Sequence, residues 1–176
     1  MDTHTFQLTA HGLVLRQWTS DDLDVMQELF DDPDVACRTP LESPFDQAAA
    51  LRYLHSAQQA RRGNERIHLA ITTDGQQALG EVLLNQATGS IGYIVGAAHR
   101  GQRLAVRALR AVTEYAHVNA TLPRVILEIE PDNHPSIAVA RSAGFRPADS
   151  PPETVTDKGR TYELLTWEHR LTADRA

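Results

Sequence analysis

The stretch Ile91–Val112, "IGYIVGAAHRGQRLAVRALRAV", decides the fold, because it joins a short apolar strand to a long amphipathic helix through a basic turn. Apolar residues recur at helical spacing from Leu104 onward, which predicts the helix. The first N–H groups of a helix lack internal partners and carry a partial positive charge. Arg100 and Arg103 add positive charge to the turn, and Gly101 allows the backbone to approach a ligand closely. The joint therefore predicts a site for an anion such as phosphate, although a solvated basic turn has the same composition.

A second segment, Glu130–Phe145 or "EPDNHPSIAVARSAGF", follows the next predicted strand. Pro135 disfavours helical geometry at the residue before it, so we expect His134 to cap a short helix. Asn133 then lies outside the helix with its amide free, and the hydroxyl of Ser136 lies in the first turn. An Asx turn at Asn133 and a hydroxyl bonded to the local backbone at Ser136 are the alternatives.

The composition is that of one soluble globular domain spanning residues 1–176. The chain is 41% hydrophobic and 23% charged with a formal net charge of −6, which argues against a nucleic-acid partner. A single cysteine excludes an intrachain disulfide and a cysteine-based zinc site. The eight histidines form no metal-binding motif, so we expect no metal. The sequence shows no signal peptide and no apolar run of about 18 residues, which favours a cytoplasmic protein without a membrane partner.

Hydrophobic periodicity and turn residues divide the rest of the chain into strands and helices. Asp74-Gly75 between two apolar runs predicts a hairpin. Asp31-Asp32-Pro33 is expected to stop the first helix, and the final strand is expected to have an exposed edge that could pair with a second copy in a homodimer. The expected fold class is α/β (α+β), a mixed but mostly antiparallel sheet of about seven strands flanked by about four helices. The predicted strands are Gly12–Trp18, Arg66–Thr73, Ala78–Gln86, Ile91–Val95, Arg124–Glu130, one at Phe145 and Thr161–Leu171, and the predicted helices begin at Thr19, Phe45, Leu104 and Pro135.

The two segments resemble the GNAT superfamily of acetyl-CoA-dependent N-acetyltransferases, and the resemblance covers nearly the whole chain. Arg100–Ala105 is similar to the family's pyrophosphate loop. Asn133 and Ser136, with the later Gly144-Phe145, are similar to its Asn-x-x-Ala/Ser…Gly-Phe block. The opening Gly12–Val35 looks like the RimJ/RimL-type branch, which acetylates protein N-termini and some small amines. The resemblance implies a GNAT-like fold and transfer of an acetyl group from acetyl-CoA to a primary amine of a peptide or small molecule, by direct attack on the thioester.

The resemblance also implies which residues hold coenzyme A (CoA). The loop would grip the diphosphate of CoA, and N–H groups near Val95 and Gly96 would pair with the pantetheine arm and polarise the thioester carbonyl. Gly92 and Gly96 suit a bulged strand on which that arm can lie. The implied cofactor-binding residues are Ile94, Val95, Gly96, Arg100, Gly101, Gln102, Arg103, Leu104, Ala105, Asn133 and Ser136.

Two residues depart from the family pattern. Arg103 stands where the loop has a second glycine, and we expect it to keep ordinary helical geometry and to turn its side chain toward a phosphate. A solvent-facing arginine is the alternative. Ala140 stands where many family members carry a tyrosine as the general acid, so Ser136 becomes the candidate hydrogen-bond donor to the CoA sulfur. These departures leave open a second function, a catalytically degenerate CoA-binding domain with a regulatory or interaction role.

Carboxylates on the predicted central strands are candidate bases that could deprotonate the amine. At pH 7 an α-amine loses its proton at a cost of about 1 kcal/mol and a lysine-like amine at roughly 4–5 kcal/mol, so a strong base is optional for N-terminal substrates. Glu81 lies on the strand before the cofactor-binding one, a place where other family members put a base. Glu130 ends the predicted strand Arg124–Glu130, which follows the cofactor-binding strand in the chain. It lies on the same face as Glu128 and is the other candidate for a catalytic role.

The acceptor is expected to lie near the two early helices and two loops, Thr39–Phe45 and Ser150–Gly159. Asp46, Asp149 and Asp157 are candidate anchors for a protonated amine. Their sequence context is that of ordinary surface acids, so the identity of the amine stays open.

Overall fold

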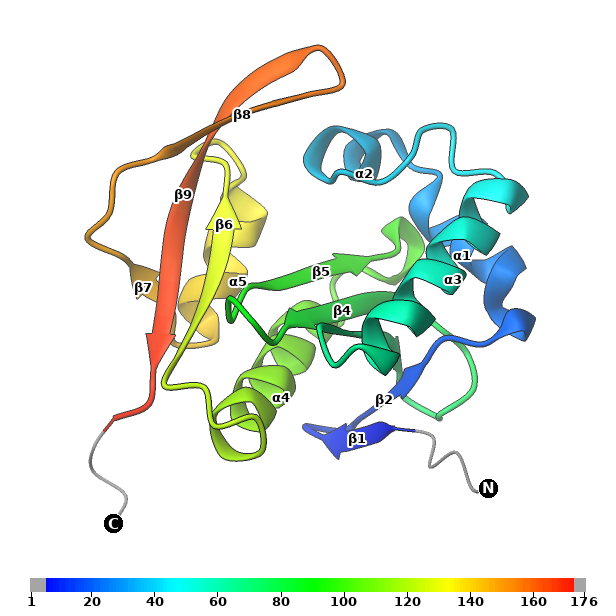
Figure 1. Ribbon diagram of the computed structural model, residues 1–176, viewed down its shortest axis with the longest axis horizontal. Helices are drawn as coiled ribbons and strands as arrows, with labels where there is room; N and C mark the ends of the chain where they lie inside the picture. The colour runs from blue at the N-terminus through cyan, green and yellow to red at the C-terminus, as the bar shows by residue number, and fades with distance from the viewer. Residues whose placement is uncertain (1–5, 173–176) are drawn as a thin grey trace.

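The computed structural model describes residues 6–172, whose strands form two sheets that diverge from one another (Figure 1). In the first sheet, five antiparallel strands follow chain order, so that each pairs with the next. In the second sheet, β9 lies between β6 and β7 and also pairs with β8. The strands are β1 (Gln7–Ala10), β2 (Leu13–Gln17), β3 (Arg66–Thr72), β4 (Gly80–Asn85), β5 (Ile91–Val95), β6 (Arg124–Ile129), β7 (Arg146–Pro147), β8 (Glu153–Asp157) and β9 (Arg160–Arg170).

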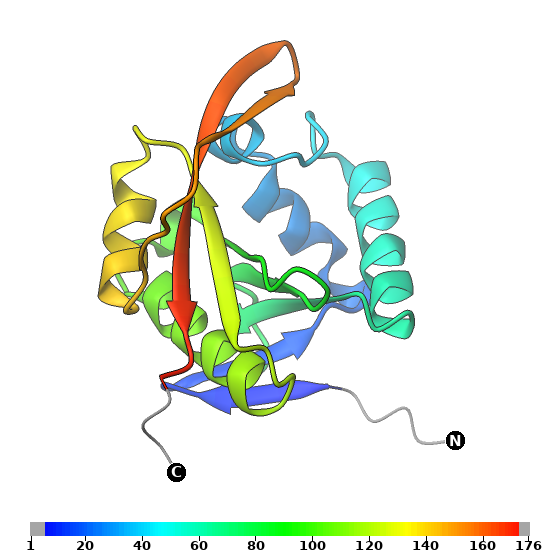
Figure 2. The ribbon, with the colours of Figure 1, turned by 60° about the vertical axis from the view of Figure 1, so that its left-hand side comes forward.

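Helices cover both faces of the first sheet. The longest apolar stripe belongs to α4, which packs against β4 and β5 on one face, while α1 and α3 pack together on the other (Figures 1 and 2). The helices are α1 (Leu23–Phe30), α2 (Pro33–Arg38), α3 (Gln47–Arg62), α4 (Leu104–Val118) and α5 (His134–Ser142), with short 3₁₀ turns at Ser20–Asp22 and Ala97–His99.

Two apolar clusters fill the space beneath these helices. Alternation along β4 places Val82 and Leu84 in the cluster beneath α4. Glu81 points to the other face, toward the cluster that contains Trp18 and Phe30. A carboxylate is therefore set among apolar and aromatic side chains, where it needs hydrogen-bond partners.

A parallel bridge between Ser90 and Ile126 joins the two sheets, and beyond it β5 and β6 separate. The hairpin around Asp74-Gly75 and the antiparallel order of β3, β4 and β5 agree with the sequence prediction. This divergence creates the opening in which the candidate site lies.

The expected fold class is confirmed, although residues 6–172 hold nine strands and five α-helices, somewhat more than predicted. The additional helix is α2. As predicted, the first helix ends before Asp31-Asp32-Pro33, because α1 stops at Phe30. The sequence did not predict that Pro33 also begins α2: it stands in the first turn, where its missing N–H is no loss, and Asp32 caps the helix by accepting from the N–H groups of Asp34 and Val35. The final strand β9 pairs with β6 along residues 165–170 and with β7 at Trp167 and Glu168, so its last half is not the exposed edge that the sequence predicts. Residues 160–164 pair with β8, and a homodimer stays a prediction.

Candidate active site

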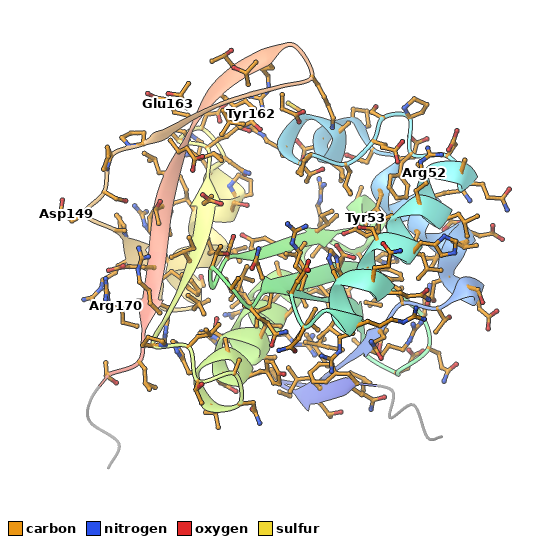
Figure 3. All side chains as sticks on the ribbon, in the orientation of Figure 1. Arg52, Tyr53, Asp149, Tyr162, Glu163 and Arg170 are labelled. Atoms are coloured by element: carbon orange, nitrogen blue, oxygen red, sulfur yellow. The ribbon has the colours of Figure 1, made fainter. Side chains whose placement is uncertain are left out.

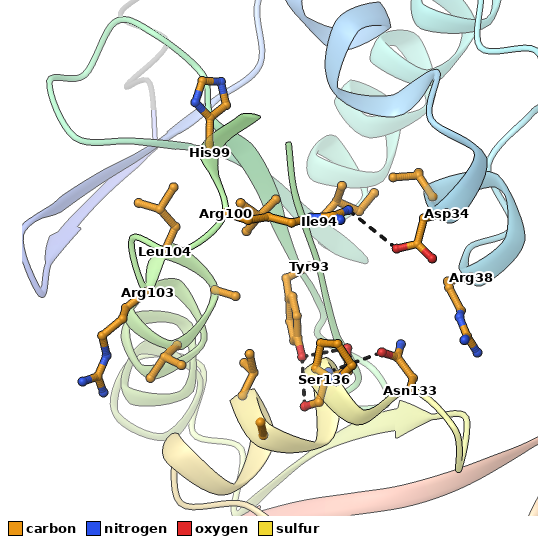
Figure 4. A pocket seen from close by; sticks show the side chains of 18 of the residues that line it. Asp34, Arg38, Tyr93, Ile94, His99, Arg100, Arg103, Leu104, Asn133 and Ser136 are labelled. Carbon is orange, nitrogen blue, oxygen red and sulfur yellow. Dashed lines mark hydrogen bonds and ion pairs between the residues drawn. The ribbon is translucent and has the colours of Figure 1, made fainter. Parts of the chain in front are cut away.

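A cleft of about 620 Å³ opens where β5 and β6 diverge (Figure 4). Its walls come from α2, β5, the turn that leads into α4, and the first turns of α5. Most of the predicted cofactor-binding residues line it: Ile94, Val95, Arg100, Gly101, Arg103, Leu104, Ala105, Asn133 and Ser136. Gly96 and Gln102 do not line it.

The free edge of β5 presents backbone groups to this cleft. The N–H of Gly96 donates to the carbonyl of Leu79 at 2.9 Å, on the side of β4. Because successive residues of a strand direct their backbone groups to opposite edges, Val95 and Tyr93 present theirs to the cleft. The expectation that Gly96 offers its N–H to a ligand is therefore wrong, whereas the N–H of Val95 faces the opening.

Gly96, which follows β5, has a role in packing rather than in a bulge. The register between β4 and β5 runs without an extra residue from Gly80 opposite Val95 to Leu84 opposite Ile91, which contradicts the predicted bulged strand. A side chain at Gly96 would collide with Leu29 of α1. The absence of a side chain there lets α1 approach the end of β5.

The turn before α4 contains two residues in the left-handed region. Gly101 has φ +84°, and Arg103 has φ +57° with ψ +24°. The expectation that Arg103 keeps helical geometry is wrong, because this residue precedes α4 in the left-handed conformation that a glycine adopts readily. For a residue with a side chain, that conformation costs roughly 1–2 kcal/mol.

Backbone N–H groups at the start of α4 form a cradle. Within residues 6–172, no protein acceptor pairs with the N–H of Leu104, Ala105 or Val106, and no side chain caps the helix at Arg103. Left-handed residues next to helical ones turn consecutive N–H groups toward one point, which suits an anion. A phosphate therefore fits this turn through backbone donors and the positive end of the α4 dipole.

The two arginines of the turn point in different directions. Arg100 lies across the cleft from α2, with a guanidinium nitrogen 3.6 Å from a carboxylate oxygen of Asp34 (Figure 4). Arg103 is exposed and its side chain extends along the outer side of the cleft, away from Ser136 (Figure 4). Whether Arg103 contacts a phosphate stays a prediction.

The first turn of α5 forms the opposite wall. The side-chain oxygen of Asn133 accepts from the N–H of Ser136 at 3.3 Å, so Asn133, and not His134, caps the helix. Pro135 is tolerated because it stands in the first turn, where its N–H would have no partner. The amide of Asn133 is therefore engaged through its oxygen, and the α5 N-terminus faces the cleft.

A tyrosine that the sequence reading did not single out completes this wall. The hydroxyl of Tyr93, on β5, donates to the hydroxyl of Ser136 at 3.2 Å and lies 3.4 Å from its carbonyl oxygen. Burial raises the pKa of Tyr93, while the hydrogen bond with Ser136 acts in the opposite direction. Ala140 is fully buried in the core beneath α4, so its position faces away from the cleft. Alternation along the predicted cofactor strand Ile91–Val95, on which Tyr93 lies, was the signal that could have found it.

The family model for the Acetyltransferase (GNAT) domain matches residues 12–146. The chain belongs to this acetyltransferase family. It is 26% identical over 165 residues to the "uncharacterized N-acetyltransferase p20" of Bacillus licheniformis, covering 89% of this chain and 92% of that protein.

Solved structures of this family share the fold of the chain at low sequence identity. Mycobacterium smegmatis RimJ in complex with CoA-disulfide is 20% identical, with a TM-score of 0.78 over 94% of this chain and 86% of that chain. The ribosomal-protein-S5-alanine acetyltransferase from Vibrio fischeri is 15% identical, with a TM-score of 0.80 over 97% of this chain and 100% of the other. The RimJ/RimL-type resemblance of the GNAT chain therefore extends to its fold.

In this GNAT acetyltransferase, the first candidate base lies outside the cleft. Glu81 is 1% exposed and accepts hydrogen bonds from Trp18 Nε1 at 2.7 Å and from the Tyr53 hydroxyl at 2.5 Å. His68 Nδ1 lies 3.0 Å from the same hydroxyl. Burial, together with the charge of Glu81, raises the pKa of Tyr53 well above its ordinary value. The carboxylate is thus satisfied by its own protein partners on the face of β4 opposite α4.

The second candidate base is bound by arginines. The carboxylate of Glu130 accepts from the Arg160 guanidinium at 2.6 and 2.7 Å and lies 2.9 Å from Arg38. Arg160 lowers the pKa of Glu130, with Arg38 acting in the same direction and burial against both. A carboxylate held in this way accepts a proton poorly at neutral pH.

Glu130 belongs to a set of contacts that fix α2 over the end of the cleft. Lys158 donates to the carbonyls of Ala36 and Thr39, and Arg160 donates to that of Cys37. These bonds attach the β8–β9 hairpin to the last turn of α2, as the approach of the two elements shows (Figure 1). The Thr39 end of the first predicted acceptor loop lines the cleft.

The three predicted amine anchors are not brought together. Asp46 caps α3 through the N–H of Ala49 at 2.8 Å. Asp149 lies on the outer side of β9, remote from β5 (Figure 3). Asp157 ends β8, inside a segment that was expected to be a loop. None of the three lines the cleft.

Two absences hold within residues 6–172. In that range no group of three or more potential metal ligands comes together. No helix within the same residues combines the length and the apolar character that crossing a membrane requires.

Proposed function

We propose that this GNAT acetyltransferase moves an acetyl group from acetyl-CoA to the α-amine of a peptide or a small molecule. The observation that carries the proposal is the cleft itself, in which an unpaired strand edge meets an unpaired helix N-terminus. The pantetheine arm of CoA carries amides that can pair with the backbone of Tyr93 and Val95, as a neighbouring strand would. The diphosphate carries the negative charge that the unpaired N–H groups of the cradle at Leu104–Val106 would bind.

In the proposed reaction the neutral amine attacks the thioester carbonyl. A C–N bond forms, the C–S bond breaks, and the sulfur leaves as the CoA thiolate. Ser136 lines the cleft at the N-terminus of α5, where both its hydroxyl and the partial positive charge of the helix favour a developing negative charge. The proton that the amine loses passes to water.

The two candidate bases support an α-amine rather than a lysine-like amine as the acceptor. Glu81 is enclosed by its protein partners, and Glu130 is paired with arginines. Without a protein base, an α-amine with a pKa near 7.7–8.0 is deprotonated at a cost of about 1 kcal/mol at pH 7. The neighbours whose names specify ribosomal-protein acetylation agree with an acceptor of this class.

The test measures release of free thiol from acetyl-CoA with a panel of amines. The panel contains peptides with free N-termini, the same peptides with acetylated N-termini and a free lysine, free amino acids, and a polyamine. Turnover with free N-termini, lost on blocking them, is the expected result. A preference for the blocked lysine peptides would contradict the α-amine assignment.

Calorimetric titration with CoA separates this proposal from the alternative of a degenerate CoA-binding domain. Heat on titration without turnover on any amine in the panel would support the regulatory alternative. No heat at all would contradict both. Leu104 is part of the buried core, so the test uses the half-buried Ala105. Ala105→Pro removes one N–H of the cradle in the first turn of α4, as Pro135 lacks one in the first turn of α5, and should weaken CoA binding about tenfold.

A further inference from the structure

The inner wall of the cleft contains a pair of hydroxyl groups that come from two elements distant in sequence. Tyr93 lies on β5 and Ser136 on α5, and their hydroxyl oxygens are 3.2 Å apart (Figure 4). We propose that Tyr93 is a positioning residue that fixes the Ser136 hydroxyl so that its proton points at the CoA sulfur. This inference rests on the proposed function, because it concerns the step in which that sulfur leaves.

The hydrogen-bond inventory of Ser136 supports this orientation. Its hydroxyl oxygen accepts from Tyr93, and its N–H donates to the Asn133 side chain. Within residues 6–172, no protein acceptor takes the proton of the Ser136 hydroxyl. A serine hydroxyl has one proton and rotates to suit its partners. With one lone pair occupied from the side of β5, the proton is left to point into the cleft that Ser136 lines.

The donor role of Tyr93 is set by its surroundings. The ring lies between β5 and α5, packed against the core beneath α4, which restricts the directions available to its hydroxyl. Burial raises the pKa of Tyr93, so the phenol keeps its proton at neutral pH and acts as a donor. The same property makes it a poor acid, which is why its effect is exerted through Ser136 rather than by direct proton transfer.

The arrangement also accounts for Ala140. That position is fully buried and outside the cleft, so a longer side chain there would have to displace core residues. The tyrosine hydroxyl near the expected sulfur position comes from β5 instead. Two hydroxyls in series, with Ser136 nearer the sulfur, form one hydrogen-bonded unit whose members act together.

The first experiment compares Tyr93→Phe, Ser136→Ala and the double variant in steady-state kinetics with the best amine of the panel. Ser136→Ala removes the donor and should lower kcat about 100-fold. Tyr93→Phe keeps the Ser136 hydroxyl but removes the hydrogen bond that orients it. This variant should lower kcat about tenfold while KM for acetyl-CoA changes less than twofold. The double variant should be no slower than Ser136→Ala, because Tyr93 acts through that residue.

Tyr115→Phe is the matched control, since Tyr115 lies on α4 and packs against Phe6 outside the cleft. It should leave kcat and KM unchanged. If Tyr93→Phe lowers kcat as much in the Ser136→Ala background as in the wild type, the positioning role is wrong. An unchanged kcat in Tyr93→Phe, in an active wild-type enzyme, would equally overturn it.

A second measurement does not depend on turnover and so separates this inference from the proposed function. The pKa of the thiol of bound CoA is followed by the ultraviolet absorbance of the thiolate. Both Tyr93→Phe and Ser136→Ala should raise that pKa, with the larger rise in Ser136→Ala, because each weakens the hydrogen bond to the thiolate. Equal thiol pKa values in wild type and Tyr93→Phe would contradict the inference even if no amine substrate were found.

Discussion

Glu81 and Glu130 are both buried carboxylates, and neither lines the cleft, yet the regions around them differ in kind. Glu81 lies in an aromatic pocket and is satisfied by the neutral donors Trp18 and Tyr53. Glu130 lies at the end of β6 and is satisfied by the charged side chains Arg38 and Arg160. The first carboxylate stabilises the packing of one face of the sheet, and the second joins α2 to the β8–β9 hairpin.

The difference shows that burial alone does not make a carboxylate a base. A base needs an open path to the amine and a pKa near the working pH. Glu81 has no contact with the cleft, and Glu130 is held in its charged form by two guanidinium groups. The four predictions that follow test this contrast.

The largest expected effect is on stability, at Glu81. Glu81→Ala removes the acceptor of Trp18 Nε1 and leaves a cavity, so the free energy of unfolding should fall by about 2–4 kcal/mol. Urea denaturation of the two proteins measures this difference. Glu81→Gln, which keeps one acceptor oxygen and the volume, should lose less. A fall in kcat of the folded Glu81→Gln variant without a fall in stability would instead identify Glu81 as a base.

Glu130→Gln should act mainly on the acceptor side of the cleft. The variant weakens the attachment of α2 to β6 and β9, so KM for the amine should rise about threefold to tenfold while KM for acetyl-CoA changes little. The matched control is Glu168→Gln. Arg170 and Arg124 lower the pKa of Glu168 to about 2, and Glu168 lies on the same sheet but has no ion pair with α2. A loss in kcat with unchanged KM values in Glu130→Gln would favour a catalytic role instead.

The free energy of unfolding at acid pH should show that Glu130 is held by charged partners, unlike Glu81 with its neutral partners. The pKa of Glu130 is lowered in the folded protein, so its contribution is complete above the unfolded-state pKa of about 4.3 and is lost as pH falls through the folded-state pKa. The stability difference between wild type and Glu130→Gln should therefore shrink below about pH 4. Urea midpoints between pH 3 and pH 7 measure this. A difference that is constant with pH would contradict the ionic role.

The smallest expected effect is on the pH–rate profile, which neither Glu81→Gln nor Glu130→Gln should shift. With a peptide α-amine as acceptor, kcat/KM should rise with pH to a plateau above about pH 8, which reports the amine itself. Neither Glu81→Gln nor Glu130→Gln should move that apparent pKa. An apparent pKa that moves in one variant would identify that residue as the base and would contradict the conclusion that neither carboxylate has this role.

Local sequence signals predicted most of the fold and half of the site. The hairpin at Asp74-Gly75, the stripe of α4 and the basic turn before it rest on short-range rules, and the structure has all three in place. Tyr93 was missed because its value depends on Ser136, which lies 43 residues later in the chain. The cap is Asn133 and not the predicted His134, because the side-chain oxygen of Asn133 accepts from the N–H of Ser136. The prediction relied only on the effect of Pro135 on the backbone of His134.

The sequence by itself determined most of the order of strands and helices, the basic turn before α4 and the presence of a serine at the start of α5. Periodicity, turn residues and helix termini are properties of neighbouring residues, so they can be read without a fold. Only the tertiary structure decided that Arg103 is left-handed and that Glu81 and Glu130 have different partners. Backbone strain and carboxylate pairing depend on groups brought together from distant parts of the chain, and no local pattern records them.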